Sequence, residues 1–164
     1  MSTGIYIGRF QPFHLGHASA IKQALSQVKQ LIIGIGSSQY QNTPNNPYPA
    51  TLRRDMIENW LTDEKLESKC HIINLPDIHN AKKWVEHVQQ LSPSFDCVFV
   101  GGEGVVKHLF TTANLPVKNV EIEHPISATQ IREQLKKGDD TWKLHVPKST
   151  LEILTNQHAL SASN

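Results

Sequence analysis

The sequence lacks a charge excess of either sign, and this shortage argues against two classes of protein. Lysine and arginine number 16 against 15 aspartate and glutamate residues, for a formal net charge of +1. A general binder of nucleic acid or of a membrane surface needs a clear basic excess. We therefore expect neither partner, although a local cationic cluster would suffice for a small phosphorylated ligand.

Cysteine and long apolar runs are also scarce. The only cysteines, Cys70 and Cys97, each stand at the start of an apolar run, where a small apolar side chain fits. Cytosolic disulfides are rare, so we expect free thiols, with a disulfide or a shared metal ion left open. The chain shows no secretory signal and no run near the roughly 18 apolar residues of a membrane span, so we expect a cytoplasmic location.

Alternating strand and helix patterns predict one α/β domain over residues 1–164, with a frayed tail at about 159–164. Ser127 suits a helix N-cap, and Pro147 suits a first helical position. Right-handed crossovers between such strands give a Rossmann-like, doubly wound, parallel five-stranded sheet with helices on both faces. The expected strands are 4–8, 30–36, 70–75, 97–102 and 117–122, and the expected helices are 17–28, 51–61, 81–91, 104–110, 127–137 and 147–158.

The stretch GRFQPFHLGH, residues 8–17, combines groups that suit a bound anion. It links the first predicted strand to the first predicted helix, at the sheet edge where ligands of open α/β sheets bind. Gly8 allows a sharp turn and a close approach to the backbone, and the helix start offers unpaired N–H groups. His14 and His17 add hydrogen-bond donors, and Arg9 adds a fixed charge, so the stretch predicts a triphosphate site.

Two other interpretations of His14 and His17 stay open here. Histidines three apart can bind one metal ion only from the same helical face, and a third ligand is needed. Pro12 and Gly16 make the segment a loop turning into a helix, and no carboxylate is nearby in sequence. The second interpretation is that both histidines only pack the turn.

A long loop, residues 37–50, is rich in proline and asparagine and is expected to be functional or mobile.

These residues carry a family resemblance. GRFQPFHLGH resembles the HxGH signature of the nucleotidyltransferase superfamily, and ISATQIRE (126–133) resembles its second signature, a turn opening a helix that carries an arginine. The series GRFQPFH, IIGIGSSQ, NNPY, LPDI, WVEHV and VPKS, in this order, resembles the archaeal-type nicotinamide mononucleotide (NMN) adenylyltransferases. The resemblance runs from residue 4 to about residue 155.

The resemblance implies a reaction of NMN with ATP that gives NAD and pyrophosphate, with Mg²⁺ held mainly by the ATP phosphates and no metal ligand from the protein. His14 and His17 would contact the ATP phosphates and the transition state, with Arg9 beside them. Arg132 would bind the β- and γ-phosphates, and Gly101 would let adenine lie against the backbone. The implied ATP site is Gly8, Arg9, Phe10, His14, Gly16, His17, Gly101, Ser127, Thr129 and Arg132, with His14, His17, Arg9 and Arg132 as the catalytic set.

The resemblance also implies an NMN site around WVEHV. Trp84 would stack on the nicotinamide ring, although a tryptophan on an amphipathic helix is more often a core residue. Arg53 fits the helix-borne arginine of the family, with Arg54 as the alternative. The implied NMN site is Trp84, Asp77, Ile78, Asn80, Arg53, Gly36 and Ser37.

The chain departs from its relatives at two informative positions. Asn45 replaces a basic residue that some relatives carry in the 37–50 loop, which leaves two alternatives: the phosphate contact is missing, or another residue such as Lys143 or Lys148 supplies it. Ala81 stands where relatives tend to have asparagine, which leaves the choice between NMN and nicotinate mononucleotide open.

The alternatives are a nicotinate mononucleotide or phosphopantetheine adenylyltransferase and, from another class, a non-catalytic pyridine-nucleotide sensor. The expected partners are ATP, NMN, NAD and pyrophosphate. A homo-oligomer is also implied by the resemblance.

Overall fold

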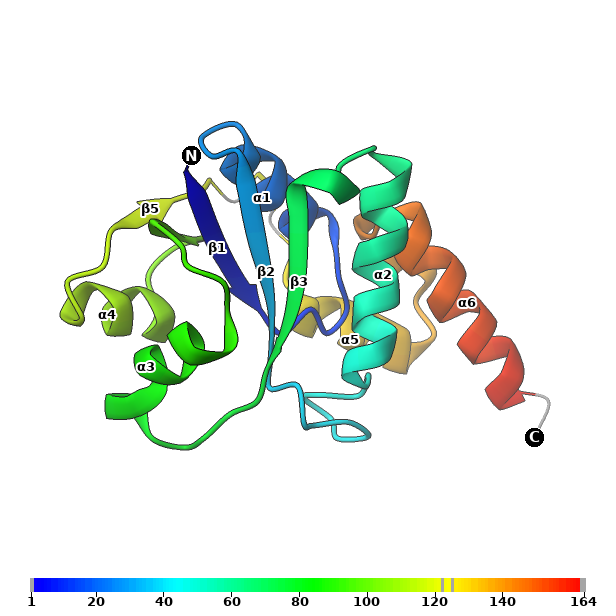
Figure 1. The fold of residues 1–164 in the computed structure, drawn as a ribbon. Coiled ribbons are helices and arrows are strands. Elements are labelled where there is room, and N and C mark those ends of the chain that lie inside the picture. Colours follow the sequence, from blue (N-terminus) through cyan, green and yellow to red (C-terminus); the bar gives the residue numbers. More distant parts are fainter. Residues whose placement is uncertain (1, 122, 125, 163–164) are drawn as a thin grey trace.

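The computed structural model describes residues 2–121, 123–124 and 126–162. Five strands form one parallel sheet in the order β3-β2-β1-β4-β5. The chain winds outward from β1 to β3 and then returns to the other side of β1, so the sheet is doubly wound (Figure 1). The strands are β1 (Thr3–Gly8), β2 (Gln30–Gly36), β3 (Cys70–Leu75), β4 (Cys97–Val100) and β5 (Val117–Asn119).

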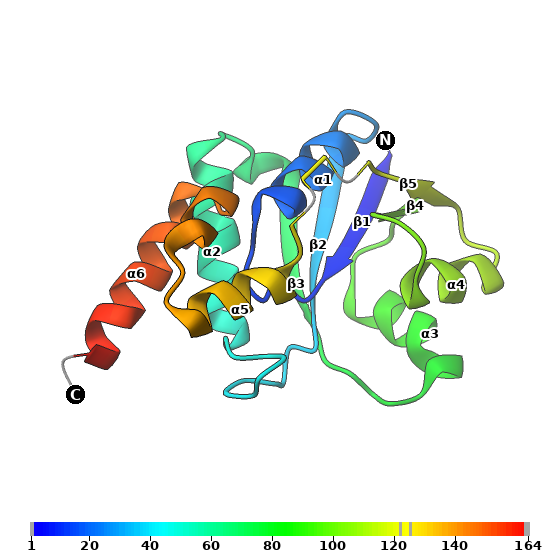
Figure 2. The ribbon, with the colours of Figure 1, turned by 180° about the vertical axis from the view of Figure 1, so that it is seen from behind.

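Helices cover both faces of the sheet, which confirms the predicted α/β fold (Figures 1 and 2). The apolar side chains divide into two core clusters, one on each face, as expected for strands whose sequences are almost continuously apolar. One face carries α1 (Leu15–Leu25), α2 (Ala50–Asp63), α5 (Ala128–Lys137) and α6 (Lys148–Ala162), and the other carries α3 (Ala81–Leu91) and α4 (Val105–Thr112).

Element ends differ from the prediction by a few residues. The strand expected over 97–102 ends at Val100, and the one expected over 117–122 ends at Asn119, with position 122 outside the described residues. Pro147 precedes α6 instead of starting it, and α6 continues through Ala162, so positions 159–162 are helical. Two short 3₁₀ helices, η1 (Glu67–Lys69) and η2 (Asp140–His145), were not predicted.

The cysteines are free thiols, as expected. Cys70 begins β3 and Cys97 begins β4, and β2 and β1 lie between these strands. Three strand spacings amount to about 14 Å, twice the separation that a disulfide or a shared metal ion permits. Burial raises the pKa of the Cys70 thiol to about 11, so this side chain is a poor nucleophile.

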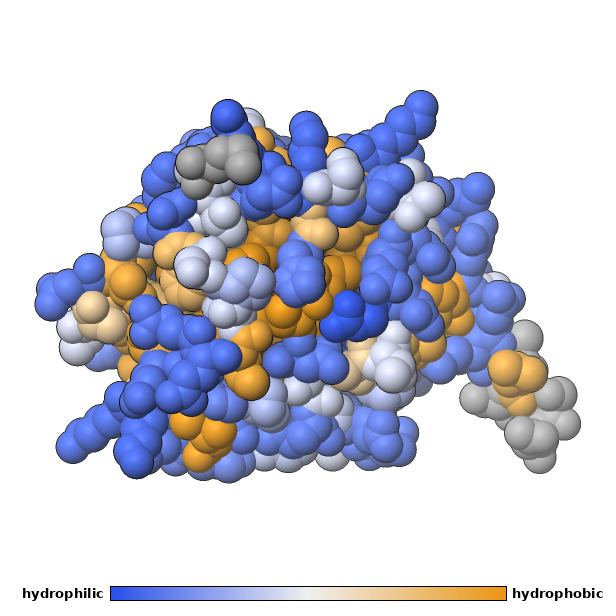
Figure 3. Space-filling view, viewed as in Figure 1, coloured by the Kyte–Doolittle hydropathy of each residue, from blue (hydrophilic) through white to orange (hydrophobic). Residues whose placement is uncertain are grey.

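Polar side chains cover most of the face of the molecule that is turned to the viewer in Figure 1. On this face, apolar side chains show mainly over the central strands (Figure 3). Within the described part of the chain, no helix combines the length and apolar character needed to cross a membrane.

The five strands are parallel, so their carboxyl ends share one edge of the sheet, and those of β1, β2 and β3 point downward in Figure 1. The loops that follow β1, β2, β3 and β4 gather there, as does the N-terminus of α1. The strand order reverses between β1 and β4, and ligands of doubly wound sheets bind beside such a reversal. The fold therefore places the stretch 8–17 at the expected binding edge.

Candidate active site

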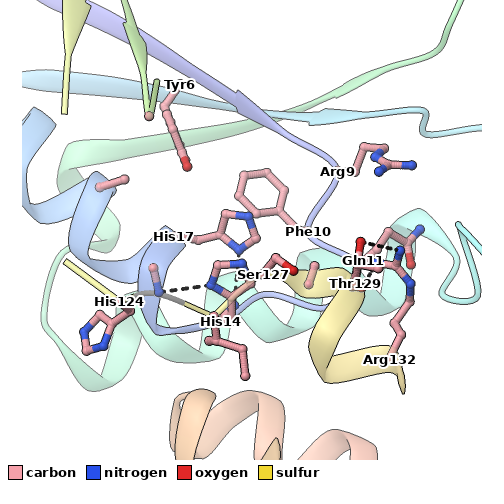
Figure 4. A pocket seen from close by; sticks show the side chains of 15 residues that line it. Tyr6, Arg9, Phe10, Gln11, His14, His17, His124, Ser127, Thr129 and Arg132 are labelled. Atoms are coloured by element: carbon pink, nitrogen blue, oxygen red, sulfur yellow. Dashed lines mark hydrogen bonds between the residues drawn. The ribbon is translucent and has the colours of Figure 1, made fainter. Parts of the chain in front are cut away.

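A cavity of about 480 Å³ opens at the carboxyl ends of β1 and β4 (Figure 4). Its walls come from the loop after β1, the start of α1, the end of β4 and the start of α5. Segments that are more than 100 residues apart in sequence, 8–17 and 126–132, therefore face each other across one space. Nine of the ten predicted ATP-site residues line it: Arg9, Phe10, His14, Gly16, His17, Gly101, Ser127, Thr129 and Arg132.

Gly8 is the predicted residue that does not line this cavity. A Cβ atom at Gly8 would lie 3.1 Å from the ring of Phe10. Phe10 takes a left-handed backbone conformation, with φ of 54°, and its side chain is almost fully buried. The missing side chain of Gly8 therefore lets the Phe10 ring turn inward, and this shapes the loop that carries the histidines.

His14 and His17 form the N-terminus of α1 through their Nδ1 atoms. His14 is the N-cap, and its Nδ1 accepts a hydrogen bond from the Gly16 N–H at 3.0 Å. His17 Nδ1 accepts from the His14 N–H at 3.2 Å, which completes a reciprocal capping box. The two rings stack with centroids 3.7 Å apart. Each histidine thus satisfies one helix-start N–H group.

This capping leaves each Nε2 as the hydrogen-bond donor of its ring. Burial lowers the pKa of His14 to about 4, with smaller contributions from His124 and His145. Burial also lowers the pKa of His17 well below its usual value, helped by His14. Both rings are therefore neutral at pH 7, and a neutral imidazole that accepts at Nδ1 carries its proton on Nε2. Two N–H donors of this kind suit phosphate oxygens.

The same tautomer argues against a metal site at these histidines. A metal ligand needs a free nitrogen lone pair, but each Nδ1 lone pair faces a backbone N–H and each Nε2 carries a proton. Across the residues that the structure describes, no group of three histidine, cysteine, aspartate or glutamate side chains is arranged to hold a metal ion.

Arg9 and Arg132 give the cavity an unbalanced positive charge. Arg132 Nη1 donates to the Gln11 carbonyl at 2.8 Å, and its Nη2 donates to the Thr129 hydroxyl at 3.3 Å. Burial, and then the nearby Arg9 guanidinium, lower the pKa of Arg132. In the described part of the chain, neither arginine has a carboxylate within ion-pair distance. Two close cations without a counterion favour a bound anion.

Helix α5 directs its N-terminus at the same cavity. Ser127 is the N-cap, as predicted, and its Oγ accepts from the Gln130 N–H at 3.2 Å. The Gln130 side chain accepts from the Ser127 N–H at 2.8 Å, so this helix also starts with a capping box. The Ser127 hydroxyl hydrogen remains available for a ligand oxygen. Two helix N-termini, with their positive dipole ends, thus border one cavity.

A second, smaller cavity of about 250 Å³ lies between the loop after β3 and helices α3 and α4. Its wall includes four of the residues expected at the NMN site: Asp77, Ile78, Asn80 and Trp84. The Trp84 ring packs edge-on against Phe110, with centroids 5.9 Å apart, and is half-buried. Trp84 is therefore both a core residue and a cavity residue. Asn80 caps α3 by accepting from the Lys83 N–H at 3.3 Å.

Comparison with known proteins places this site in a family. A family model described as cytidylyltransferase-like matches residues 5–134. The nicotinamide-nucleotide adenylyltransferase of Thermoplasma volcanium is 36% identical over 157 residues, which cover 94% of this chain and 86% of that protein. The corresponding protein of Thermococcus onnurineus is 38% identical over 153 residues, which cover 92% and 81%. The chain belongs to the nicotinamide-nucleotide adenylyltransferases of the cytidylyltransferase-like family.

Solved structures agree with this assignment. A bifunctional NMN adenylyltransferase/ADP ribose pyrophosphatase from Francisella tularensis superposes with a TM-score of 0.73 at 26% identity. The match covers 84% of this chain and 42% of that longer one, so the chain spans less than half of the bifunctional protein. A second structure of the same protein, complexed with AMP and a Mn ion, gives a TM-score of 0.70 at 27% identity.

Arg53, which the family resemblance puts at the NMN site, is fully buried and lines neither of the two cavities. Its Nη1 donates to the Arg9 carbonyl at 2.7 Å and to the Gly36 carbonyl at 2.8 Å. Its Nη2 donates to the Ser37 carbonyl at 3.2 Å. Arg53 therefore joins the loop after β1 to the loop after β2.

Gly36 and Ser37, also expected at the NMN site, are likewise not in the wall of the smaller cavity. Gly36 supplies a carbonyl to Arg53, and the Ser37 hydroxyl donates to the Asp77 carboxylate at 2.8 Å. Arg54, the alternative to Arg53, donates to the Ile72 carbonyl and pairs with Glu58. These predicted contacts are therefore indirect in the structure.

The structure also brings residues to the large cavity that were not expected at the ATP site. Tyr6 and His124 line it, and burial raises the pKa of the Tyr6 phenol to about 12, which keeps it protonated. Gln11 joins the cavity to the 37–50 loop, because its amide makes two hydrogen bonds to the backbone of Tyr48. His124 lies two residues before the second signature, and this proximity is the one feature of the sequence that could have indicated its place in the cavity.

Lys143 and Lys148 do not bring to the large cavity the positive charge that some relatives have at the position of Asn45. Lys143 pairs with Asp140 at 3.0 Å, and Lys148 pairs with Glu152 at 3.8 Å. Neither lysine lines the large cavity. Asn45 borders a neighbouring groove that also includes Arg132.

We predict that Arg53→Met lowers the free energy of unfolding by about 2–4 kcal/mol, because buried carbonyl oxygens lose their donor. The matched control is Arg54→Met, on the next position of α2, whose ion pair with Glu58 is partly exposed. It should cost below about 1 kcal/mol. Urea denaturation of both variants measures the difference, and equal losses would contradict the role given to Arg53.

We also predict that His14 makes the protein less stable in acid. In the unfolded chain this imidazole takes up a proton near pH 6.5, but in the fold its pKa is about 4. Between these values the unfolded state binds more protons, so the free energy of unfolding falls as pH decreases. The loss from this residue is about 2–3 kcal/mol between pH 7.5 and pH 4.5.

Urea denaturation at these two pH values checks the prediction. The control is His14→Asn, since asparagine keeps an N-cap acceptor and does not titrate. The variant should lose less stability in acid than the wild type. If both lose the same amount, His14 does not titrate as described.

Proposed function

We propose that this protein transfers the adenylyl group of ATP to NMN, forming NAD and pyrophosphate. One observation carries the proposal: a single cavity holds two neutral Nε2–H donors, two arginines without counterions and two helix N-termini. Each of these groups favours phosphate oxygens. The cavity around Trp84 opens at the same edge of the sheet and offers a place for the aromatic ring of the substrate that accepts the adenylyl group.

The chemistry requires alignment more than proton transfer. The second pKa of a phosphate monoester is near 6, so the NMN phosphate is mostly a dianion at pH 7 and needs no general base. It attacks the α-phosphate of ATP in line, the bond from that phosphorus to the bridging oxygen breaks, and pyrophosphate leaves. The enzyme has to align two anions and stabilise the charge that develops on the leaving group.

We assign the triphosphate to the large cavity. His14 and His17 donate from Nε2 to the transferring phosphate, and the Arg132 guanidinium binds the leaving pyrophosphate. Arg9, Ser127 and Thr129 add donors along the same path. Gly101, at the end of β4, leaves room for adenine against the backbone.

Magnesium fits this site as a companion of ATP. The described residues that line the cavity include no carboxylate, and Mg²⁺ prefers oxygen ligands. The triphosphate oxygens and water would therefore hold the ion, and Mg²⁺ would neutralise charge on the leaving pyrophosphate. The Francisella tularensis structure with AMP and a Mn ion makes a divalent cation reasonable for this fold.

The nicotinamide ring is assigned to the smaller cavity, stacked on Trp84, with Asp77, Ile78 and Asn80 around it. The ring of NMN is a pyridinium cation, which a nearby aspartate carboxylate favours. The same carboxylate would repel the acid group of nicotinate mononucleotide. Although Ala81 replaces an amide side chain, Asp77 therefore favours NMN over the acid. We also propose a homo-oligomer in the cytoplasm, on the family resemblance.

We predict that purified protein with Mg²⁺ and ATP releases pyrophosphate with NMN and at least about tenfold less with nicotinate mononucleotide, measured as kcat/KM. Dinucleotide formation followed by chromatography checks that pyrophosphate release reflects transfer. A preference for the acid would reverse the specificity. Turnover with 4′-phosphopantetheine alone would indicate the other adenylyltransferase, and tight NAD binding without turnover would indicate a sensor.

We further predict that His17→Ala lowers kcat/KM for dinucleotide formation by about 10²–10³-fold, because it removes a donor to the transition state. The matched control is His108→Ala, whose side chain is exposed on α4 and lines neither cavity. Circular dichroism confirms that both variants fold. Near-normal turnover of a folded His17→Ala protein would remove His17 from the catalytic set.

A further inference from the structure

The loop after β2 makes three hydrogen bonds to Asp77. Gln39 Nε2 donates to the Asp77 carbonyl, and the Asp77 N–H donates to Gln39 Oε1, both at 2.9 Å. The side-chain amide thus satisfies both backbone groups of one residue, as a neighbouring strand would. The Ser37 hydroxyl donates to the Asp77 carboxylate at 2.8 Å. Both the backbone and the side chain of Asp77 are therefore held from a single loop.

These three hydrogen bonds determine the position of one wall of the smaller cavity. Asp77 begins the segment 77–80 that forms this wall, opposite α4, and Trp84 follows one turn into α3. Within the same pair of loops, the Tyr40 hydroxyl lies 2.7 Å from His79 Nε2. Since the segment is otherwise irregular, its position depends on these contacts with the loop after β2.

Similar amide pairs elsewhere in the chain serve other segments. Gln11 makes the same two hydrogen bonds to the backbone of Tyr48, at 2.9 and 3.0 Å. The 37–50 loop is thus held at its start through Gln39 and at its end through Gln11. Gln11 lines the large cavity, whereas Gln39 hydrogen-bonds to Asp77 in the wall of the smaller cavity. The two glutamines therefore support different cavities.

We propose that Gln39, together with Ser37, is a positioning residue for the nicotinamide-side substrate, acting through Asp77. This inference rests on the proposed function. Without Gln39, the Asp77 backbone exchanges two protein hydrogen bonds for water and the wall beside Trp84 becomes less ordered. ATP does not meet this wall. The loss therefore falls on binding of NMN and leaves binding of ATP unchanged.

The test compares Gln39→Ala, Gln39→Glu and the control Gln41→Ala in steady-state dinucleotide formation. Gln41 is exposed on the same loop. Gln39→Ala should raise KM for NMN about three- to tenfold, while KM for ATP and kcat stay within about twofold. Gln39→Glu keeps the acceptor for the Asp77 N–H but faces the Asp77 carbonyl with a second oxygen. It should raise KM for NMN at least as much.

Thermal unfolding of each variant separates positioning from general destabilisation. A parallel rise of both KM values with a lowered melting temperature would show that Gln39 only supports the fold, and would overturn the inference. Unchanged KM for NMN in an active Gln39→Ala protein would overturn it as well. If the wild-type protein itself makes no dinucleotide from NMN and ATP, the proposed function fails, and this inference fails with it.

Discussion

The buried guanidinium of Arg53 is the contact on which the binding edge depends. It joins the carbonyls of Arg9, Gly36 and Ser37, which belong to the ends of two neighbouring strands. Burial, and then the charge of Arg9, lower the pKa of Arg53 to about 10, so it stays protonated at pH 7. A full charge surrounded only by carbonyl dipoles is costly to bury, and these hydrogen bonds offset that cost. This one side chain therefore ties the loop after β1, which lines the large cavity, to the loop after β2, which contacts Asp77 in the wall of the smaller cavity.

At the start of α1, each histidine ring serves two purposes. Each histidine uses one ring nitrogen to cap the helix and keeps the other for the cavity. Capping therefore fixes the tautomer, and burial keeps the rings neutral. A charged imidazolium would donate from Nδ1 as well, and the capping hydrogen bonds would be lost. Folding of the helix and presentation of phosphate donors are thus a single arrangement.

The sequence allowed most of the fold to be predicted, and nine of the ten residues expected at the ATP site line one cavity, because strands and signature motifs are short local patterns. Apolar runs gave the strands, and His14, His17 and Arg132 stand in two compact motifs. The role of Arg53 could not be predicted, because its partners are backbone carbonyls, which leave no mark on residue identity. His124 and Gln39 were missed for a related reason, since their place depends on how loops from different strands meet.

The large cavity also shows how an almost neutral chain can gather positive charge in one place. The 15 acidic residues balance the total charge, but none lines this cavity among the described residues. The ion pairs that occur involve exposed lysines and Arg54. Burial, and then the Arg9 guanidinium, lower the pKa of Arg132, so the fold holds two cations close together without a counterion. Such an arrangement favours an anion in the large cavity, because an anion between the two guanidinium groups would offset their repulsion.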